Sequence, residues 1–484
     1  MCSFLFTRTR SRIVETDLQR SNFHARFRGP DLTTTKHEIG SDGWHLTYLH
    51  NLLDISGSTC AQPACQGGEG KRLRAIFNGE IYNYRQLADV SSDTQCLLPL
   101  YQRRGCAIGQ ELDGEFSIAI YDEEKNSAFV FTDPFLTKPL YFGRGREPGD
   151  FGVATCRSSL AGLGFEDVQM AEPNSAYAIG FSAEFIREER QFPLYEFDLR
   201  QHKGTYADWR RAFFEAVRKR ATHGAHQSAV FLSSGYDSGG ICVALNELKI
   251  PYDTFSIVAG EEGGIIADRI RINRHRSCRR AFRYRGISRR QRERLAADIR
   301  TNVENFRYSH EDGPGLVTAL HDDHGAVGAN FIAAEARSHR SLVNLSGSGA
   351  DEILSDYGFA GKKIYHHSQF GGHFPDDLAG FFPWKKFYGD TQRSYLFKDE
   401  FILGRHGVEG RYPYLDKQVV QEFLWLAPEL KNRAYKAPLA DLLHDSAYPF
   451  ESGAKRGFSP DQPPSAVRTF LGQVARRLGV ICRR

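Results

Sequence analysis

The stretch FLSSGYDSGG, residues 231–240, constrains the fold more than any other part of the sequence. A short apolar run, residues 229–232, ends abruptly in Ser and Gly, and the helix-like pattern ICVALNEL follows. A strand that turns into a helix through Gly and Ser points backbone N–H groups at one spot, where the helix N-terminus adds partial positive charge. Such a turn either binds phosphate or is an ordinary capped turn. The GxxxxGK[ST] pattern of a Walker A loop is absent.

One acidic residue, Asp237, stands inside this turn. Bare phosphate would repel a carboxylate, so Asp237 fits phosphate binding mainly if Mg²⁺ lies between the two. The hydroxyl groups of Ser233, Ser234 and Ser238 can donate to phosphate oxygens.

A second turn of the same kind follows later in the chain. In SLVNLSGSGADEILSDYG, residues 341–358, an apolar run again leads through Ser and Gly to an acid, Asp351, at a helix start. Two such turns at the carboxyl ends of parallel strands would lie side by side in an open α/β sheet, where nucleotides bind. Asp237 and Asp351 could then share Mg²⁺ held by a triphosphate.

Length and composition favour a cytoplasmic globular protein of two or more domains. The chain has 484 residues, too many for one core. No apolar run reaches the roughly 18 residues of a membrane span, and no basic segment precedes the N-terminal apolar patch, so neither a membrane partner nor a signal peptide is expected. The nine cysteines form no CxxC pair, which favours reduced thiols.

The sequence changes character near residues 196–204. Before this segment, RLRAIFNGEIYNY, GEFSIAIYD and SAFVFTDPF predict strands, while YRQLADV and TQCLLPLYQRRG predict helices. After it, YADWRRAFFEAVRKRAT predicts an amphipathic helix, and the alternation of strand-like and helix-like runs predicts a parallel sheet with crossover helices. We expect domains at residues 1–195 and 205–484, with a loop or hinge at 368–384.

Several segments resemble asparagine synthetases. FLSSGYDS resembles the SGGxDS loop of ATP pyrophosphatases that adenylate a substrate and release pyrophosphate; LSGSGADE, GVEGRYPYLDKQVVQEFLWLAPELK and AKRGFSP resemble later segments of the synthetase domain. MCSF, RFRGPD, FNGEIYN, ELDGEFSIAIYD and TKPLYF resemble, in order, the glutaminase domain of the same enzymes. The resemblance implies an αββα N-terminal-nucleophile sandwich followed by an α/β ATP-pyrophosphatase domain. It also implies a glutamine-dependent amidotransferase that uses ATP and Mg²⁺.

The resemblance assigns roles in the first domain. Trimming of the initiator Met would expose Cys2, whose α-amino group titrates near neutrality and can take the thiol proton. The thiolate would attack the glutamine amide, and Asn78 with the backbone N–H of Gly79 would stabilise the oxyanion. Glu80 and Asp93 would bind the rest of glutamine. Without the neighbouring FNGEIYN segment, Cys2 would be read as an ordinary buried residue.

One departure concerns the glutamine carboxylate. The family usually has an Arg five residues before the Asp of its RLSIID segment, and this chain has Leu49 there. Arg28 is our candidate for the missing group, with Arg26, Arg72 and Arg74 as alternatives. If none of them serves, glutamine binds weakly or free ammonia is the donor.

The resemblance places ATP over the first Gly/Ser turn and next to the second. The expected ATP-binding residues are Leu232, Ser233, Ser234, Gly235, Asp237, Ser238, Ile257 and Gly347, with Ser256 nearby. Lys455 resembles the family lysine that holds pyrophosphate or the transition state. Lys436 could do the same, although a solvated surface lysine is the simpler expectation there.

A second departure concerns the acceptor. Ser348 and Glu352 are expected in the acceptor pocket, and Ser348 stands where asparagine synthetases have Glu and β-lactam-forming relatives have Tyr. Ser carries no charge, so we expect aspartate to be a poor acceptor and another carboxylate, such as a sugar acid, a peptide or a natural-product acid, to be a better one. A neighbouring acid such as Glu352 could still supply the missing charge.

Residues 269–294 are nearly half Arg. The simpler interpretation is a solvated helix face, and the alternative is a site for an anionic acceptor or partner. Nucleic acid is not expected, because only Phe282 and Tyr284 interrupt the basic residues and single strands need aromatic platforms.

Three functions compete at this point. The first is a glutamine-dependent amidotransferase that adenylates and then amidates a carboxylate, with asparagine synthetase itself as its special case. The second is a cyclase or ligase of the same fold, of the β-lactam or lasso-peptide type, and the third is a binding protein that has lost activity. Cys2, Asp237 and Asp351 favour the first. The sequence does not name the acceptor, decide between glutamine and ammonia, or decide whether the protein is a homodimer.

Overall fold

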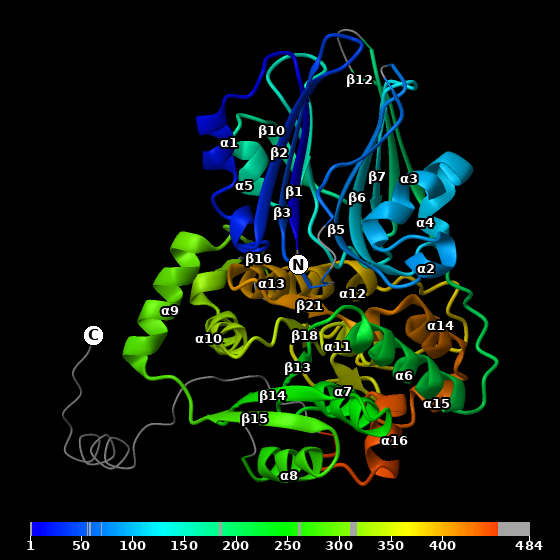
Figure 1. Ribbon diagram of the computed structural model, residues 1–484. Coiled ribbons are helices and arrows are strands. Elements are labelled where there is room, and N and C mark those ends of the chain that lie inside the picture. The colour runs from blue at the N-terminus through cyan, green and yellow to red at the C-terminus, as the bar shows by residue number, and fades with distance from the viewer. Residues whose placement is uncertain are drawn as a thin grey trace.

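The chain folds into two differently built parts. The computed structural model describes residues 2–55, 57, 60–68, 70–182, 186–259, 263–309 and 317–453. The strands β1 to β12 form the upper part in Figure 1, and the remaining strands with most helices form the lower part. Within the described residues, no helix combines the length and the apolar character needed to cross a bilayer.

The upper part is a sandwich of two six-stranded sheets in which every strand pairing is antiparallel. The first sheet has, in spatial order, β10 (Glu166–Met170), β8 (Tyr141–Arg144), β9 (Phe151–Ala154), β1 (Ser3–Thr9), β3 (His45–Leu52) and β2 (Leu32–Ile39). The second has β12 (Ile186–Pro193), β11 (Ser175–Phe181), β7 (Ser127–Thr132), β6 (Gly114–Asp122), β5 (Leu73–Ile81) and β4 (Ala64–Gln66).

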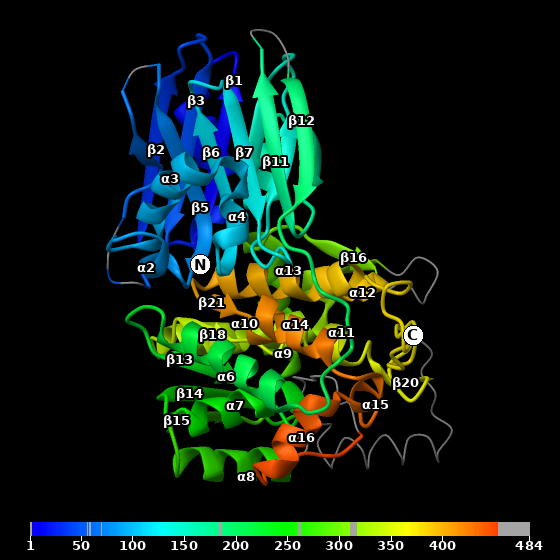
Figure 2. The ribbon, with the colours of Figure 1, turned by 90° about the vertical axis from the view of Figure 1, so that its right-hand side faces the viewer.

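Helices cover the outer face of each sheet, as Figures 1 and 2 show. They are α1 (Glu15–Ser21) and α5 (Arg157–Ala161) on one side, and α2 (Tyr84–Leu87), α3 (Asp93–Arg104) and α4 (Ile108–Glu111) on the other. This is the αββα arrangement that the sequence predicts. Because β6 and β7 are covered on both faces, they are buried along almost their whole length and lack the polar alternation of a half-exposed strand.

The lower part contains a five-stranded parallel sheet. Its spatial order is β15 (Cys278–Tyr284), β14 (Tyr252–Ile257), β13 (Ser228–Phe231), β18 (Val343–Leu345) and β21 (Glu409–Arg411). Two short hairpins, β16 (Arg307–Ser309) with β17 (Val317–Ala319) and β19 (Gly358–Phe359) with β20 (Lys362–Lys363), lie outside this sheet. The sheet confirms the predicted α/β fold, and it places β13 and β18 side by side.

Helices surround the parallel sheet. They are α6 (Ala207–Thr222), α7 (Tyr236–Glu247), α8 (Gly263–Arg274), α9 (Arg289–Asn302), α10 (His324–Ser338), α11 (Ala350–Leu354), α12 (Lys385–Tyr388), α13 (Asp390–Arg405), α14 (Lys417–Trp425), α15 (Pro428–Lys431) and α16 (Ala437–Asp445). Helix α6 begins where the sequence predicts an amphipathic helix, and its predicted apolar face, which includes Trp209 and Phe213, is buried. Residues 368–384 form neither helix nor strand.

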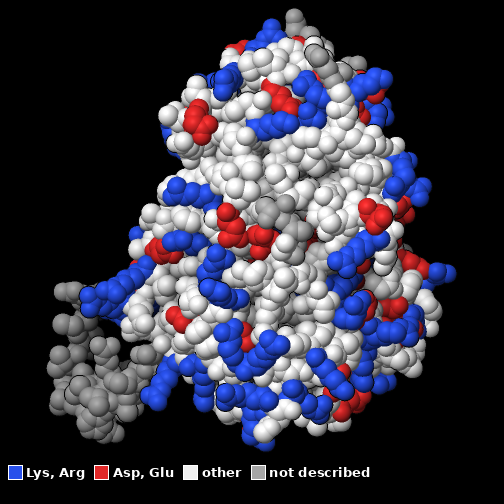
Figure 3. Space-filling view, in the orientation of Figure 1, with Lys and Arg blue, Asp and Glu red and all other residues white. Residues whose placement is uncertain are grey.

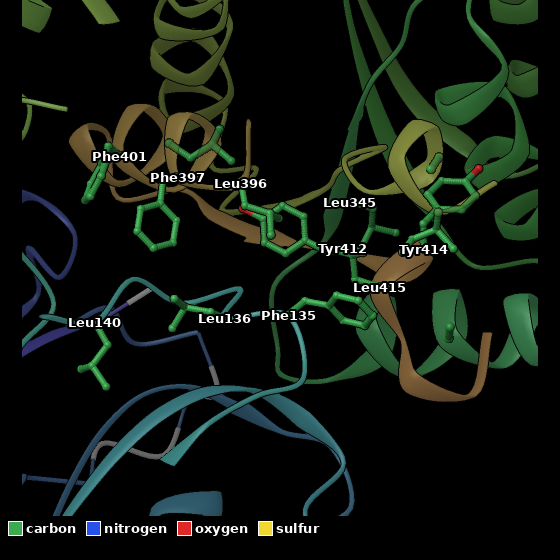
Figure 4. Close-up of a cluster of buried hydrophobic side chains, with 14 of the residues drawn as sticks. Phe135, Leu136, Leu140, Leu345, Leu396, Phe397, Phe401, Tyr412, Tyr414 and Leu415 are labelled. Atoms are coloured by element: carbon green, nitrogen blue, oxygen red, sulfur yellow. The ribbon is translucent and has the colours of Figure 1, made fainter. Parts of the chain in front are cut away.

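The two parts meet across a buried apolar contact, drawn in Figure 4. Phe135, Leu136 and Leu140, which follow β7, face Phe397 of α13 and Tyr412 after β21, and all of these side chains are buried. The contact joins the loop between β7 and β8 of the sandwich to α13 and to the residue after β21 of the lower part.

Ion pairs without solvent access accompany this contact. Glu400 of α13 lies 2.6 Å from Arg28 and 2.9 Å from Lys138, both of the upper part. Arg220 of α6 lies 2.6 Å from Glu115 of β6. All of these side chains are at most 2% exposed. Removing one partner of such a pair costs about 3–5 kcal/mol because a buried charge is left uncompensated, so the pairs fix the two parts against each other.

Candidate active sites

The first Gly/Ser turn follows β13 and leads into α7, as predicted. The backbone N–H of Leu232 donates to the carbonyl of Phe255 (2.8 Å), which extends the pairing with β14 past the end of the strand. Ser233 Oγ accepts from the N–H of Gly235 (3.1 Å), and Ser238 Oγ accepts from the N–H of Ser233 (3.1 Å). These hydroxyls therefore shape the turn, a role that the sequence analysis did not assign to them.

Arg269 also stabilises this turn by hydrogen bonds to its backbone. Its Nη1 donates to the carbonyls of Ser233 (2.6 Å) and Gly235 (2.8 Å), and Nε donates to the carbonyl of Pro449 (2.8 Å). A Cβ on Gly239 would lie 2.8 Å from Arg269 Nη2, so the glycine leaves room for the guanidinium. The first Arg of the basic run is thus buried and structural, contrary to the expectation of a solvated face.

The other arginines of the basic run are exposed, apart from the half-buried Arg292, and the run is only partly helical. It forms the end of α8, the strand β15 and the start of α9, and basic side chains gather on the lower part of the face in Figure 3. Phe282 stacks on His339 (ring centroids 4.0 Å apart), and Tyr284 donates to Glu335 (2.8 Å). Both aromatic residues already pack against α10, so they provide no free platform for bases.

The second Gly/Ser turn lies directly against the first. It follows β18 and leads into α11, and a Cβ on Gly347 would lie 2.6 Å from the Cβ of Asp237. Gly349 caps α11 with φ +94°, a left-handed conformation that favours glycine. The two turns are therefore neighbours at the carboxyl edge of the sheet, where the sequence analysis predicts them.

Lys436 links the two acids of these turns. Its Nζ lies 2.5 Å from Asp237 Oδ1 and 2.7 Å from Asp351 Oδ1, and its side chain is only 2% exposed. Tyr435 donates to the same oxygen of Asp351 (2.6 Å). Burial alone would lower the pKa of Lys436, but the two carboxylates outweigh burial and raise it, so the ammonium is retained. The expectation of a solvated surface lysine is wrong.

The backbone of Lys436 is unusual as well. It stands immediately before α16 with φ 49° and ψ 51°, a left-handed conformation that a residue with a Cβ rarely adopts. Non-glycine residues hold such conformations where the surroundings demand them, often at functional sites. Here the conformation accompanies a side chain that reaches both Asp237 and Asp351 from a distant part of the chain.

A cavity of about 610 Å³ opens over the two turns. Ser233, Gly235, Asp237, Gly347, Asp351 and Lys436 line one part of it, and Tyr308, Asp323, His324, Tyr357, Tyr365, His367, Tyr395, Lys398 and Asp399 line another. A second cavity of about 240 Å³, lined in part by Leu232, Ser238, Phe255 and Leu345, adjoins it through Ser233, Gly347, Ser348 and Asp399. Ile257 ends β14 and lines neither cavity, whereas Phe255 of the same strand lines the second cavity. Lys455 lies outside the described residues.

Asp399 places a carboxyl group beside Ser348. Ser348 Oγ donates to Asp399 Oδ2 (2.6 Å), and Ser346 Oγ donates to the same oxygen (2.8 Å). Burial raises the pKa of Asp399 above its ordinary value, while these hydrogen bonds act in the opposite direction. Glu352, which the sequence analysis considered for this purpose, instead accepts from Tyr357 (2.5 Å). The sequence gives no direct signal for Asp399, which lies on α13.

The candidate glutaminase residues lie at the lower end of the sandwich, next to the second part. Cys2 precedes β1 and is half-buried, and its carbonyl accepts from Arg28 Nε (3.2 Å). Burial raises the pKa of the Cys2 thiol to about 11, and the charges of Glu409 and Glu80 act in the same direction. A thiol with this pKa needs a base beside it to react at neutral pH.

Asn78 and Gly79 lie on β5 and have the properties of an oxyanion site. The Asn78 side chain is fully buried, and neither its Oδ1 nor its Nδ2 has a hydrogen-bond partner among the described residues. Buried amides normally have partners, so an unpaired one is suited to a group that arrives with a substrate. Gly79 has φ +135°, and a Cβ there would lie 1.9 Å from the carbonyl oxygen of Glu115, so only glycine fits.

Glu80 and Asp93 lie together, joined by His223 from the second part. One oxygen of each carboxylate and a ring nitrogen of His223 lie within 4.8 Å of one another. Asp93 accepts from the N–H groups of Ile81 (3.2 Å) and Thr94 (2.8 Å). Burial, followed by the charge of Glu80, raises the pKa of Asp93 to about 7. His223 has no counterpart in the sequence motifs.

The candidate arginines for the glutamine carboxylate all have other partners. Arg28 pairs with Glu400, Arg72 with Glu123 (2.5 Å) and Arg74 with Glu38 (2.9 Å). Arg26 lies over the rings of Phe23 and Phe27. Leu49, at the family's Arg position, is buried in β3 and 4% exposed. The contacts of Arg28 thus make it a link between the two parts rather than an available carboxylate ligand.

Fold and sites together define a protein with an amidotransferase-type sandwich joined to a nucleotide-binding parallel sheet. Residues 1–192 match the glutamine amidotransferase domain family, and residues 208–401 match the asparagine synthase family. The chain is an asparagine synthetase-like protein, as its motifs predict.

Three relatives illustrate the distance within this family. A protein of Acanthamoeba polyphaga mimivirus, named probable glutamine-hydrolysing asparagine synthetase, is 25% identical over 74% of this chain and 65% of its own length. A putative glutamine-hydrolysing asparagine synthetase of Methanocaldococcus jannaschii is 25% identical over 81% of this chain and 72% of its own length. A glutamine-hydrolysing asparagine synthetase of Arabidopsis thaliana is 26% identical over 87% of this chain and 69% of its own length. The chain spans about two-thirds of these relatives. Glutamine phosphoribosylpyrophosphate amidotransferase from B. subtilis overlaps with a TM-score of 0.33 at 12% identity, over 94% of this chain and 99% of that one, which carries no further conclusion.

Proposed function

We propose that the protein is a glutamine-dependent amidotransferase that adenylates an acceptor carboxylate with ATP, amidates it, and releases AMP and pyrophosphate. The observation that carries this proposal is Lys436, buried between Asp237 and Asp351 at the carboxyl ends of two adjacent parallel strands. A turn that binds only phosphate would not need two carboxylates beside a buried lysine. Two acids and an ammonium at one point suit a triphosphate together with its metal ion.

ATP would bind across the two turns, with its phosphates over residues 233–238 and its adenosine towards Leu232, Phe255 and Gly347. The N-terminus of α7 would bind phosphate oxygens. The absence of a side chain at Gly347 lets Asp237 approach the second turn. The internal hydrogen bonds of Ser233 and Ser238 keep the turn in shape before ATP arrives.

Asp237 and Asp351 would hold Mg²⁺. The fit follows from Lys436: a single cation, its ammonium, already lies within 2.7 Å of one oxygen of each carboxylate. When bound, Mg²⁺ supplies charge neutralisation at the phosphates. Lys436 would then turn from the carboxylates to the phosphate oxygens, where an ammonium stabilises the charge that develops as pyrophosphate leaves. Lys455 remains a candidate for the same task.

In the first part, Cys2 would attack the side-chain amide of glutamine. Its α-amino group, once Met1 is trimmed, would take the thiol proton. Asn78 Nδ2 and the N–H of Gly79 would donate to the oxyanion of the tetrahedral intermediate. Collapse of this intermediate breaks the C–N bond, so ammonia leaves as the thioester forms, and water then hydrolyses the thioester to glutamate. Glu80 and Asp93 would bind the ammonium group of glutamine. The buried Asn78 amide, which has no partner among the described residues, supports its proposed role at the oxyanion.

The acceptor would bind in the tyrosine-lined part of the larger cavity, near Ser348. Asp399 is a carboxylate in this pocket, so an acceptor that carries an amine next to its carboxylate gains a charged partner. This observation favours aspartate, and thus asparagine synthetase proper, as the second candidate. It stands against the expectation that aspartate is a poor acceptor, because a carboxyl group lies beside position 348 although Ser348 itself has none.

Exchange of labelled pyrophosphate into ATP tests the proposal before the acceptor is known. The enzyme, ATP, Mg²⁺ and labelled pyrophosphate are incubated with aspartate and with a panel of other carboxylic acids. We expect one class of acid to promote the exchange, and Lys436→Met to abolish it while Lys363→Met, at an exposed position, leaves it intact. Acid-dependent formation of ADP without any exchange would rule out adenylation.

A further inference from the structure

Residues 223–225, between α6 and β13, reach from the second part into the glutaminase site. The N–H of Ala225 donates to the carbonyl of Ile55 (3.0 Å). Gly224 has φ +96°, and a Cβ there would lie 2.8 Å from the same carbonyl oxygen. The close approach and the left-handed backbone both require glycine, so this segment is fixed against the sandwich and its first residue, His223, is placed with it.

His223 binds Glu80 directly. Its Nε2 lies 2.7 Å from Glu80 Oε2, and Asp93 completes the cluster within 4.8 Å. The rings of Tyr82 and Tyr84 meet the imidazole edge-on, with centroids 5.2 and 5.9 Å away. The His223 side chain is 13% exposed. The imidazole is therefore held among two aromatic rings and two acids, where it cannot rotate freely into solvent.

We infer that the imidazolium of His223 occupies the place of the substrate ammonium group, so that the second part of the chain competes with glutamine for Glu80 and Asp93. This inference rests on the proposed role of these acids in binding glutamine. An imidazolium and an ammonium are both cationic hydrogen-bond donors, and a pair of carboxylates can accept only one such group at this spot. Glutamine can bind fully only when His223 leaves Glu80.

The charges around His223 determine how this competition depends on pH. Glu80 on β5 and Asp93 at the start of α3 face it, Arg411 of β21 lies 3.4 Å from Glu80, and the rings of Tyr82 and Tyr84 pack against it. Burial is the largest influence on the pKa of His223 and would lower it, but the charge and the hydrogen bond of Glu80, together with the charge of Asp93, raise the pKa above its ordinary value. The guanidinium of Arg411 beside Glu80 adds positive charge, which disfavours a divalent metal ion in this cluster.

Arg411 also connects His223 to the nucleotide half. Its Nη1 donates to the carbonyl of His223 (2.8 Å), and β21 pairs with β18, which leads into the second Gly/Ser turn. The segment after His223 leads directly into β13 and the first turn. His223 thus contacts both parts: its backbone continues into the framework that carries both nucleotide turns, and the residues after it rest against the sandwich.

Glutaminase kinetics of His223→Gln test the inference. Gln is neutral and of similar size, so the cationic competitor is removed while the packing is largely kept. Because a hydrogen bond to a charged group is worth enough to change an equilibrium by about tenfold or more, we expect KM for glutamine to fall by roughly tenfold, with kcat changing less than KM. His275→Gln, at an exposed histidine of the basic face, is the matched control.

Two further measurements keep the outcomes distinct. The wild-type KM should fall as pH rises above 6, because loss of the proton from Asp93 and then from His223 favours the ammonium of glutamine. The fall should be shallower in His223→Gln, where the proton of His223 no longer contributes. In the Cys2→Ala background, calorimetry should show tighter glutamine binding when His223 is also replaced. If His223→Gln is active and its KM for glutamine is unchanged or raised, the inferred role of His223 is overturned, while the proposed glutaminase function is not. No glutaminase activity and no glutamine binding in either protein overturns the proposed function of the whole site.

Discussion

Gly347 lies so close to Asp237 that a single added Cβ would come within 2.6 Å of the aspartate Cβ. The contact joins two turns that are more than a hundred residues apart in sequence. It allows the acids of both turns to approach one ammonium, that of Lys436. The nucleotide site of this protein depends on the absence of one side chain as much as on the presence of its charges.

Gly347→Ala is therefore expected to separate the turns. The added methyl must displace Asp237 or the backbone, at a cost of about 1–3 kcal/mol in the free energy of unfolding. ATP-dependent activity should fall by far more than the unfolding midpoint suggests, because Asp237 is moved. Urea unfolding and AMP formation, measured together, check this. The control is Gly264→Ala in α8, where a Cβ would meet nothing within 4 Å; equal activity losses in the two variants would contradict the argument.

Asp399→Asn separates charge from shape in the acceptor pocket. The amide keeps a hydrogen bond to Ser348, so the fold should be undisturbed. Since burial raises the pKa of Asp399, the folded protein binds its proton more tightly than the unfolded chain does, and at neutral pH the charge lowers stability. We expect Asp399→Asn to unfold at the same or a higher urea concentration.

The same variant should lose affinity for an amine-bearing acceptor. Loss of the charged partner is worth about 1.5–3 kcal/mol, roughly tenfold to more than a hundredfold in KM for an acceptor such as aspartate. Acceptors without an amine should be less affected. Steady-state kinetics with several acids measure this, and a variant that is both less stable and equally active with aspartate would show that Asp399 is merely structural.

Cys2→Ala is expected to abolish glutamine hydrolysis but to leave synthesis from free ammonia. The reason is spatial: Cys2 lies at the end of the sandwich, whereas the nucleotide turns lie at the edge of the parallel sheet. Ammonium chloride should restore AMP formation to about the wild-type ammonia-dependent rate. If a folded Cys2→Ala protein does not respond to ammonia, the two reactions are not independent.

Glu400→Gln tests the buried junction between the two parts. The neutral side chain leaves Arg28 and Lys138 without their shared carboxylate, which should lower the free energy of unfolding by about 3–5 kcal/mol. Arg28 also donates to the carbonyl of Cys2, so glutaminase activity should fall as well. Glu429→Gln, at an exposed position on α15, is the control. Chemical unfolding that shows equal stability of both variants would contradict this account of the junction.

The sequence predicts much of this fold because its signals are local. Each Gly/Ser turn stands between a strand and a helix, so its position in a parallel sheet follows from a dozen neighbouring residues. Gly79 and Asn78 are found in the same way, from a short segment on one strand. The alternating elements after residue 205 then predict which edge of the sheet both turns share.

The residues whose place in the site the sequence misses or leaves open are brought there from a distance. Lys436 reaches Asp237 across 199 positions of the chain, and Asp399 reaches Ser348 across 51. A lysine before α16 and an aspartate within α13 look like ordinary solvated residues until the tertiary fold surrounds them. The same holds for His223, whose partner Glu80 belongs to the other part of the chain.

Isotope transfer shows whether an acceptor carboxylate attacks the α-phosphorus of ATP next to Lys436. An acceptor identified by pyrophosphate exchange is labelled with ¹⁸O in its carboxylate and incubated with enzyme, ATP, Mg²⁺ and glutamine. Adenylation predicts one ¹⁸O in the phosphate of AMP, visible in its ³¹P spectrum, with pyrophosphate unlabelled. Lys436→Met should reduce the rate by about a hundredfold or more, as loss of a transition-state charge partner does. Unlabelled AMP, or ADP with ¹⁸O in inorganic phosphate, would contradict the account.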